Sequence, residues 1–409
     1  MKVFYVLALT VLFFSCKTET PIKEVTMKED VYFLADDKLE GRETGTPTEK
    51  ESAKYLAERF KNMGLDPKGT DEYLQYFTFK PKTHPHGEAT FVDGKVDSTI
   101  TGVNVVAFID NKAENTVIIG AHYDHLGHGI EGTLHRGEKN AIHNGADDNA
   151  SGVAVMMNLA SKLKGKNTNN NYLFISFSGE EMGLLGSNYF VKNPTIDTKI
   201  VNYMINMDMV GRLNEERAIA VYGVGTSPKF SQVLFANNKD FKLTEKESGV
   251  GPSDHTSFYL ADMPVLHFFT GQHEDYHKPT DDADKLNYEG MADISEYIMA
   301  IITDLDNDGK LAFRKTKNES DNTPEFKVTL GVVPDYLYDG EGMRLDGITE
   351  DKPAHGAGMK KGDIVVKVGE YEITDMMSYM KCLSKFEKGE KVMVLVERDG
   401  EIVELEVTW

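Results

Sequence analysis

The sequence predicts an α/β protein: a three-layer α/β/α domain around a mainly parallel mixed sheet, followed by a small β-rich domain. The first domain is indicated by four short apolar runs, each followed by polar or acidic residues: 117–119, 172–177, 201–207 and 264–269. Such runs are typical of buried strands, and their alternation with helical patterns predicts a parallel sheet covered by helices. The second domain is indicated by the polar stretch 316–323, after which only short strand patterns dominate.

The overall composition limits the classes to which the chain can belong. Its 409 residues are enough for two or three domains, and an apolar fraction of 40% allows a sizeable core. The formal net charge of −21 argues against a nucleic-acid-binding protein, which needs a basic face. The acidic balance identifies no ligand, because an acidic surface is usually only solvated.

Residues 1–16 have the pattern of a signal peptide. Met1-Lys2 precedes an apolar segment, residues 3–14, that is too short to span a bilayer, and Ser15-Cys16 follows. This junction resembles the processing site of a bacterial lipoprotein, so we expect lipidation of Cys16 and a polar tether over residues 17–25. A plain secretory signal cut nearby is the alternative.

Export follows from either kind of signal. We expect the protein to be lipid-anchored in the Gram-negative cell envelope, in the periplasm or at the outer membrane, or to be secreted. Cys382 is the only other cysteine, so no intramolecular disulfide is expected if Cys16 carries lipid.

The predicted catalytic domain covers residues 26–315. It opens with a helical pattern from residue 29 to 39 and a second helix over 48–63, which Thr48 and Glu51 would start as a capping box. Further strands are predicted at residues 74–80, 92 and 103–107, and further helices at residues 151–157 and 288–304.

Six residues suited to metal binding or acid–base chemistry lie just beyond predicted strand ends: His122, Asp148, Glu180, Glu181, Asp208 and His277. In an open α/β sheet, ligands bind beyond the carboxyl ends of the strands. Two histidines and three carboxylates can hold two divalent ions if one carboxylate bridges them. Mixed nitrogen and oxygen ligands suit Zn²⁺ best, with Mn²⁺ or Co²⁺ as alternatives. Such a pair of ions supports hydrolysis of an amide or an ester.

One carboxylate of this set is left over and can act as a general base. Glu180 and Glu181 are adjacent, and neighbouring side chains in a turn point in different directions, so one can bind a metal while the other faces the water. Asp124, two residues after His122, can accept the second ring N–H of that histidine and fix its tautomer.

Six motifs, in order, resemble family 28 of the metallopeptidases, the secreted leucyl-type aminopeptidases with two zinc ions. They are Ala121-His122-Tyr123-Asp124, the GADDNASG run at 145–152, the SGEE run with its following glycines at 178–187, Asn206-Met207-Asp208-Met209, Ser253-Asp254-His255, and Tyr276-His277 with Asp281. Glutamate carboxypeptidase and glutaminyl cyclase are relatives of this family. Six motifs in the right order make the resemblance specific, and they imply a fold like that of the zinc aminopeptidases.

The resemblance implies how the two ions would be held. His122 and Asp208 would bind one ion, Glu181 and His277 would bind the other, and Asp148 would bridge them.

The resemblance also implies roles around the metals. Glu180 would be the general base, and Asp147 would lie behind the ligands. His255 would sit beside the substrate pocket. The peptide bond after the bridging aspartate, Asp148-Asn149, would be cis, which is rare away from proline.

Other polar residues compete for these roles. Four histidines crowd the loop after the first central strand, and we expect them to be solvated because none ends a strand: His125, His128, His135 and His143. His273 is the serious rival of His277, which has the tyrosine and aspartate neighbours of the motif. His267 lies inside an apolar strand and is expected in the core or the pocket. Asp281-Asp282 is expected to cap the turn after Pro279.

After the linker 316–323, residues 324–409 resemble a PDZ domain of the bacterial type. The turn from Gly358 to Asp363 before a strand is the most specific part of this resemblance. It implies a carboxylate-binding loop whose backbone N–H groups hold a peptide C-terminus: Leu330, Gly331, Val332 and Val333. The alternative is a β-rich domain that packs on the catalytic domain and binds nothing.

Taken together, these features predict an exported zinc aminopeptidase that acts on peptides, contacts the membrane through a lipid anchor and binds no nucleic acid. A carboxypeptidase or dipeptidase on the same scaffold is the first alternative. The alternative from another class is an inactive peptidase-like protein that binds peptides through its PDZ domain. An intact Glu180 and a complete ligand set argue against this last reading.

Overall fold

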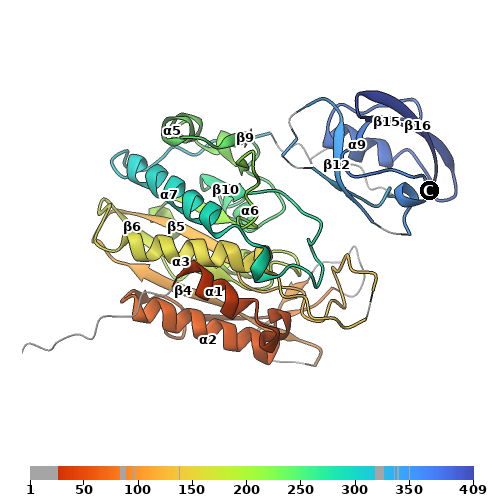
Figure 1. Ribbon diagram of the computed structural model, residues 1–409. Helices are drawn as coiled ribbons and strands as arrows, with labels where there is room; N and C mark the ends of the chain where they lie inside the picture. Colours follow the sequence, from red (N-terminus) through yellow and green to blue (C-terminus); the bar gives the residue numbers. More distant parts are fainter. Residues whose placement is uncertain are drawn as a thin grey trace, which may run out of the picture.

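A computed structural model describes residues 26–82, 89–94, 97–137, 139–317, 327–335, 337–338, 340–349 and 351–409. The predicted signal peptide with Cys16, the tether and residues 318–323 of the predicted linker lie outside these ranges. Figure 1 shows a larger domain of helices packed on a sheet and a smaller, β-rich domain at the C-terminal end. Within the described part of the chain, no helix is long and apolar enough to cross a membrane.

A ten-stranded sheet forms the middle layer of the larger domain. Its strands are β1 (Asp66–Pro67), β2 (Leu74–Lys80), β3 (Thr90–Phe91), β4 (Ile100–Ile109), β5 (Asn115–His122), β6 (Asn170–Phe177), β7 (Val201–Met207), β8 (Ala218–Tyr222), β9 (Lys242–Lys246) and β10 (Val265–Phe269). The order across the sheet is β3-β2-β4-β6-β5-β7-β10-β8-β9, and β1 pairs with β4.

The four central strands β6, β5, β7 and β10 are mutually parallel, so their carboxyl ends meet at one edge of the sheet. The strands outside them join antiparallel, through β4 on one side and β8 on the other. The predicted mixed sheet is confirmed, although β8 and β9 were not predicted. Because the predicted metal-binding residues follow the central strands, this arrangement gathers them at one place.

Helices cover both faces of the sheet. They are α1 (Met27–Leu34), α2 (Pro47–Asn62), α3 (Gly152–Leu163), α4 (Leu185–Lys192), α5 (Phe230–Asn237), α6 (His255–Tyr259) and α7 (Tyr288–Leu305). One apolar core joins α1, α2, α3, α5 and α7 to one face, as Figure 1 shows for α1, α3 and α7. A second core holds Phe190 of α4 and Phe258 of α6 against the other face.

The start of α2 differs from the prediction. The side chain of Thr46, not Thr48, caps this helix by accepting a hydrogen bond from the Glu49 N–H, and Pro47 occupies the first helical position. Proline is favoured there because its fixed φ suits a helix and its missing N–H needs no partner. The predicted first helix is likewise divided: α1 ends at Leu34, and Asp37–Arg42 forms a 3₁₀ turn.

The C-terminal domain has a core of its own around Leu345, Val365 and Val394. Its elements are β11 (Val332–Pro334), β12 (Met343–Ile348), α8 (Pro353–Gly356), β13 (Ile364–Val368), β14 (Tyr371–Glu372), α9 (Met376–Leu383), β15 (Lys391–Arg398) and β16 (Glu401–Thr408). The sheet order is β11-β12-β13-β15-β16, which leaves β11 at an edge among the described strands.

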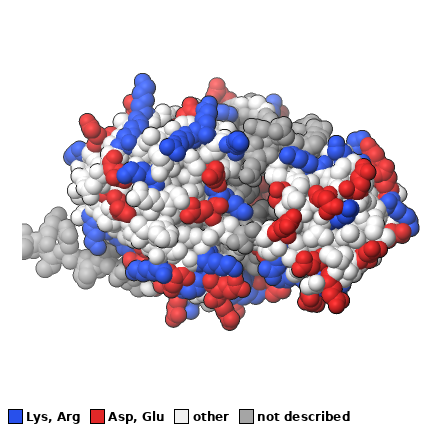
Figure 2. Space-filling model, turned by 90° about the horizontal axis from the view of Figure 1, so that it is seen from above, with Lys and Arg blue, Asp and Glu red and all other residues white. Residues whose placement is uncertain are grey.

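Charged side chains of both signs are interspersed on the face of the molecule seen in Figure 2. No extended basic patch covers that face.

Candidate metal centre

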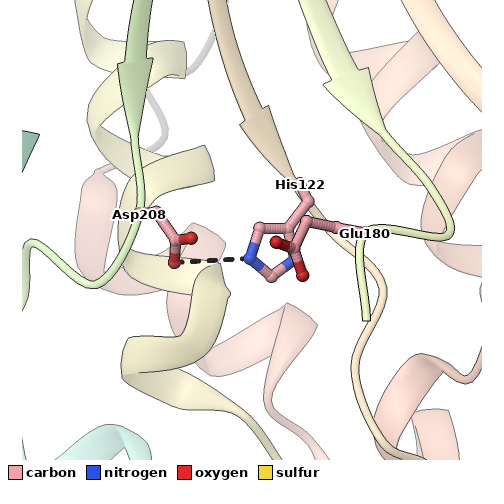
Figure 3. Close-up of side chains that lie close together, drawn as sticks. All are labelled: His122, Glu180 and Asp208. Atoms are coloured by element: carbon pink, nitrogen blue, oxygen red, sulfur yellow. Dashed lines mark ion pairs between the residues drawn. The ribbon is translucent and has the colours of Figure 1, made fainter. Parts of the chain in front are cut away.

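The carboxyl ends of β5, β6 and β7 bring three of the predicted residues together. His122 is the last residue of β5, Asp208 follows β7, and Glu180 lies three residues after β6. Figure 3 shows their side chains converging, with His122 Nε2 3.3 Å from Asp208 Oδ1. One ligand atom from each of the three residues lies within 4.8 Å of the others.

A second group adjoins the first. His277 Nε2 lies 3.2 Å from Asp148 Oδ2 and 3.3 Å from Glu181 Oε2. The other oxygen of Asp148, Oδ1, lies 3.4 Å from His122 Nε2. Asp148 therefore faces both groups with one oxygen each, which is the arrangement of a carboxylate that bridges two ions.

His273, the rival of His277, points elsewhere. Its Nε2 lies 3.1 Å from Asp147 Oδ2, behind the two groups. The Asp147 carboxylate also accepts a 2.6 Å hydrogen bond from the Gly211 N–H. Asp147 and His273 thus support the loop that carries Asp148, while His277 faces the Asp148 and Glu181 carboxylates.

The expectation that His125 is solvated is wrong. Its side chain is buried, and its Nδ1 lies 2.8 Å from Glu181 Oε1. The chain stays at the sheet edge after β5, where the His125 N–H faces the Arg42 carbonyl. A side chain at Gly145 would collide with the His125 ring at 2.5 Å, and Gly145 has a φ of +56°. His143 is also buried, with Nε2 2.6 Å from Thr133 Oγ1, so the expectation fails there too.

The residues present fit divalent metal ions. Ligand atoms that share a tetrahedral zinc ion at bonds of 2.0–2.1 Å lie about 3.3 Å apart, close to the separations found between the imidazole and carboxylate atoms. Three buried atoms that face the two groups have no hydrogen-bond partner within the described residues: His122 Nε2, His125 Nδ1 and Glu181 Oε1. Buried polar atoms are normally paired, so these atoms are suited to an ion.

Burial and charge separate the two adjacent glutamates. Burial raises the pKa of Glu180 well above its usual range, and the neighbouring carboxylates Glu181 and Asp208 raise it further. Burial would also raise the pKa of Glu181, but the nearby imidazoles of His277 and His125 lower it below the usual value. Glu181 therefore favours the anionic form that binds metal, and Glu180 can hold a proton.

Asp124 contacts His122 differently from the prediction. The closest acceptor to His122 Nδ1 is the backbone carbonyl of Asp124 at 3.2 Å, and the carboxylate Oδ1 lies at 3.7 Å. That carboxylate instead accepts hydrogen bonds from Thr44 Oγ1 at 2.9 Å and from the Glu180 N–H at 3.2 Å. Asp124 therefore positions the backbone of Glu180 as well as the His122 ring.

Two residues that hold the metal-site loops had no such role in the sequence analysis. The buried Arg42 guanidinium donates to the carbonyls of Tyr123, Asn144 and Gly145 at 2.6–3.0 Å. The Asp281 carboxylate accepts from the N–H groups of Asp147 and Asp148 at 3.0 and 3.1 Å. Asp281 therefore does more than cap its own turn. In the sequence, the motif Tyr276-His277 with Asp281 was the signal that pointed to Asp281.

A cavity of about 160 Å³ opens beside the two groups. Beyond the metal-site acids, it is lined by Tyr222, His267, Phe269 and Tyr276. His255 lies behind the wall of this cavity: it is fully buried and stacks on His267, which lines the cavity, with ring centroids 4.4 Å apart. The Asp148-Asn149 peptide bond is cis, as the resemblance implies.

The predicted carboxylate-binding loop lies at the start of the edge strand β11. Leu330 is buried, Gly331 has a φ of +72°, and Val332 and Val333 belong to β11. The Gly331 N–H donates to Thr329 Oγ1 at 3.1 Å. A ligand carboxylate would have to replace Thr329 Oγ1 as the acceptor of the Gly331 N–H.

Residues 104–302 match the model of peptidase family M28, and residues 315–408 match that of the PDZ domain. A probable leucine aminopeptidase of Arthroderma benhamiae is 29% identical over 212 residues, covering 49% of this chain and 57% of that protein. Aminopeptidase YwaD of Bacillus subtilis is 28% identical over 206 residues, covering 47% of this chain and 41% of that protein. The chain spans about half the length of the curated relatives it matches.

Among solved structures, BSAP, a zinc aminopeptidase from Bacillus subtilis, superimposes with a TM-score of 0.53 at 18% identity. The match covers 73% of this chain and 98% of that one. The superposition shows that the two share a fold, and at this identity it shows no more than that.

Proposed function

The chain carries a peptidase family M28 domain followed by a PDZ domain, and on that premise we propose that it is a zinc-dependent aminopeptidase. The observation that supports this best is the Asp148 carboxylate, whose two oxygens face His122 on one side and His277 on the other. One carboxylate shared between two such groups suits a pair of ions.

In this proposal His122 and Asp208 hold one ion, Glu181 and His277 hold the other, and Asp148 bridges them. The buried Nδ1 of His125 lies 2.8 Å from Glu181 Oε1, beside the second ion. When bound, such a pair of ions polarises a substrate carbonyl and acidifies a water at neutral pH.

Glu180 is the side chain that moves the proton. Its carboxylate takes a proton from the attacking water as the water oxygen bonds to the scissile carbonyl carbon. It returns that proton to the amine nitrogen as the C–N bond breaks. The position of Glu180 supports this role, because one of its carboxylate oxygens lies within 4.8 Å of ligand atoms of His122 and Asp208.

The substrates in this proposal are peptides with a free amino terminus. Relatives named leucine aminopeptidase and aminopeptidase support that choice over a carboxypeptidase or a dipeptidase. Product analysis on short peptides with free and blocked ends tests it: release of the first residue is expected, and blocking the amino end should abolish hydrolysis. Release of the last residue instead would assign a carboxypeptidase.

Two substitutions test the division of labour between the glutamates. Glu180→Gln keeps the size of the side chain but removes its basicity, so zinc content should stay at two ions per chain. Turnover should fall by about 10²–10⁴-fold, the usual weight of general-base catalysis. Glu181→Gln should instead lower the zinc content, and added zinc should partly restore activity.

Glu51→Gln, an exposed change on α2, is the control and should alter neither quantity. If Glu180→Gln lost metal while Glu181→Gln lost only rate, the two assignments would be exchanged. If neither change altered the rate, the chain would act as a peptide-binding protein and the peptidase proposal would fail.

We further propose that the protein is exported and anchored by lipid at Cys16. The apolar segment 3–14 before Ser15-Cys16 supports this proposal, as it would give a signal peptide and no permanent membrane helix. The PDZ domain would bind peptide C-termini through residues 330–333, since PDZ domains recognise peptides by adding them to a sheet edge.

A further inference from the structure

A cleft of about 430 Å³ lies between the two domains. On the catalytic side, residues 134–137 and 273–278 line it; on the other side, it is lined by Val333 of β11, the end of β12 and Lys361. We call it the interdomain cleft. Val333 is the last residue of the predicted carboxylate-binding loop, so the cleft meets the PDZ domain close to that loop.

The interdomain cleft adjoins the metal centre. Tyr276 lines both the cleft and the cavity beside the metal site, and its ring stacks on the His277 imidazole with centroids 3.9 Å apart. The cleft wall also holds His277: the Leu134 N–H donates to the His277 carbonyl at 3.0 Å. His277 Nδ1 lies 2.9 Å from the Gly132 carbonyl. A ligand that extends from the metal site past Tyr276 therefore enters the cleft.

The C-terminal domain contacts the catalytic domain beside the cleft. Leu337, between β11 and β12, packs with Tyr222 and Tyr276 against the apolar cluster that contains Phe269. Thr244 Oγ1 donates to the Leu337 carbonyl at 3.3 Å. Through these contacts, the side of the cleft that carries Val333 and Lys361 faces the side formed by the catalytic domain.

Positive charge gathers in the cleft although the chain as a whole is acidic. Arg136 and Lys278 come from the catalytic side and Lys361 from the C-terminal domain. Lys361 Nζ pairs with Asp346 Oδ1 at 2.9 Å, whereas Arg136 and Lys278 have no carboxylate partner among the described residues. Among the described residues of the lining, Glu274 and Asp346 carry negative charge. Two unpaired cations beside a peptide-sized space favour a carboxylate ligand.

We propose that the interdomain cleft binds the carboxylate end of a short peptide whose amino end lies at the metal centre. Arg136 and Lys278 pair with the terminal carboxylate, and Tyr276 separates this part of the site from the scissile bond. The enzyme then prefers short peptides with a free C-terminus over their amides. This proposal rests on the proposed aminopeptidase function and names the class of substrate.

The test uses the full chain with the double substitution Arg136→Gln/Lys278→Gln. Substrates are Leu-Gly-Gly, its C-terminal amide and leucine p-nitroanilide. We expect kcat/KM for the free tripeptide to fall about tenfold, the combined effect of two partly exposed ion pairs, and the amide and the anilide to be unaffected. The control Lys54→Gln/Lys61→Gln removes two exposed cations from α2 and should change none of the three.

Equal losses on the tripeptide and its amide, or no loss on either, would overturn the proposal. A third outcome would also overturn the proposal: the preference for the tripeptide over its amide is lost in Gly331→Ala but kept in the double variant. That result would assign the carboxylate to the PDZ loop. Calorimetry of both peptides with Glu180→Gln, with and without the double substitution, repeats the comparison without turnover. Binding measured by calorimetry tests the cleft without catalysis. Hydrolysis of leucine p-nitroanilide by the wild-type protein tests the proposed aminopeptidase activity separately.

Discussion

His255 should make the catalytic domain sensitive to acid. Its imidazole is fully buried and stacks on His267, and neither ring nitrogen has a hydrogen-bond partner within the described residues. Burial lowers the pKa of His255 from 6.5 to about 3. The unfolded chain exposes this imidazole and binds a proton near pH 6.5, whereas the folded chain keeps the ring neutral.

The sign and size of the effect follow from these two pKa values. Because the pKa is depressed on folding, the neutral His255 stabilises the fold fully above pH 6.5, and this contribution is lost as the pH falls toward 3. At pH 5 the unfolded state gains about 2 kcal/mol from protonation of this one group, at about 1.4 kcal/mol for each pH unit below 6.5.

The substitution His255→Leu keeps a similar volume and removes the titration. Between pH 7 and pH 5, the free energy of unfolding should therefore fall by about 2 kcal/mol less in the variant than in the wild type. Urea unfolding followed by circular dichroism measures both values. His135→Leu, which changes a half-buried loop histidine, is the control and should keep the wild-type pH dependence. An identical pH dependence in His255→Leu and the wild type would refute the reasoning.

Three further predictions concern Arg42, Leu337 and Cys16. Arg42→Ala should lower the free energy of unfolding by about 3 kcal/mol or more, because three buried carbonyls of the metal-site loops lose their donor at about 1–3 kcal/mol each. An unchanged melting temperature would contradict this. Leu337→Asp should separate the domains and weaken peptide but not anilide hydrolysis, and scattering in solution should show a larger radius of gyration. Cys16→Ala should release the protein from the membrane fraction, and equal membrane association of variant and wild type would refute lipid anchoring.

The central strands could be predicted from the sequence because they are buried on both faces. β7 has the bounds that its apolar run predicts, Val201–Met207, and all of its residues are buried. β2 lies outside the central strands and alternates between buried and accessible residues, and it too has the predicted bounds, Leu74–Lys80. β9 (Lys242–Lys246) could not be predicted in this way. Among the described strands it pairs with β8 at the edge of the sheet. It has lysine at both ends and Leu243 as its one apolar residue, so it lacks a continuous apolar run. Lysine on an edge strand is a common protection against unwanted pairing.

The candidate residues that meet at the metal centre could be picked out from the sequence because each stands in a local motif, and His122, Glu180 and Asp208 also stand at or just after a strand end. The position of the loop that carries Asp148 could not be predicted, because that loop depends on partners far away in sequence. Arg42 holds its start across more than 100 residues, and Asp281 holds its N–H groups across more than 130 residues. His125 was misjudged for the same reason, since its burial depends on contact with Glu181.

The net charge also fails to predict a feature that depends on residues far apart in the sequence, and this feature bears on the proposed function. A value of −21 averages over the whole chain and predicts no cationic site. Arg136, Lys278 and Lys361 are more than 80 residues apart from one another, and only the fold brings them to one cleft beside Tyr276. The net negative charge disfavours peptide carboxylates on average, so under the proposed function a local cationic cleft next to the metal centre would draw them to the place where the amino end would be cleaved.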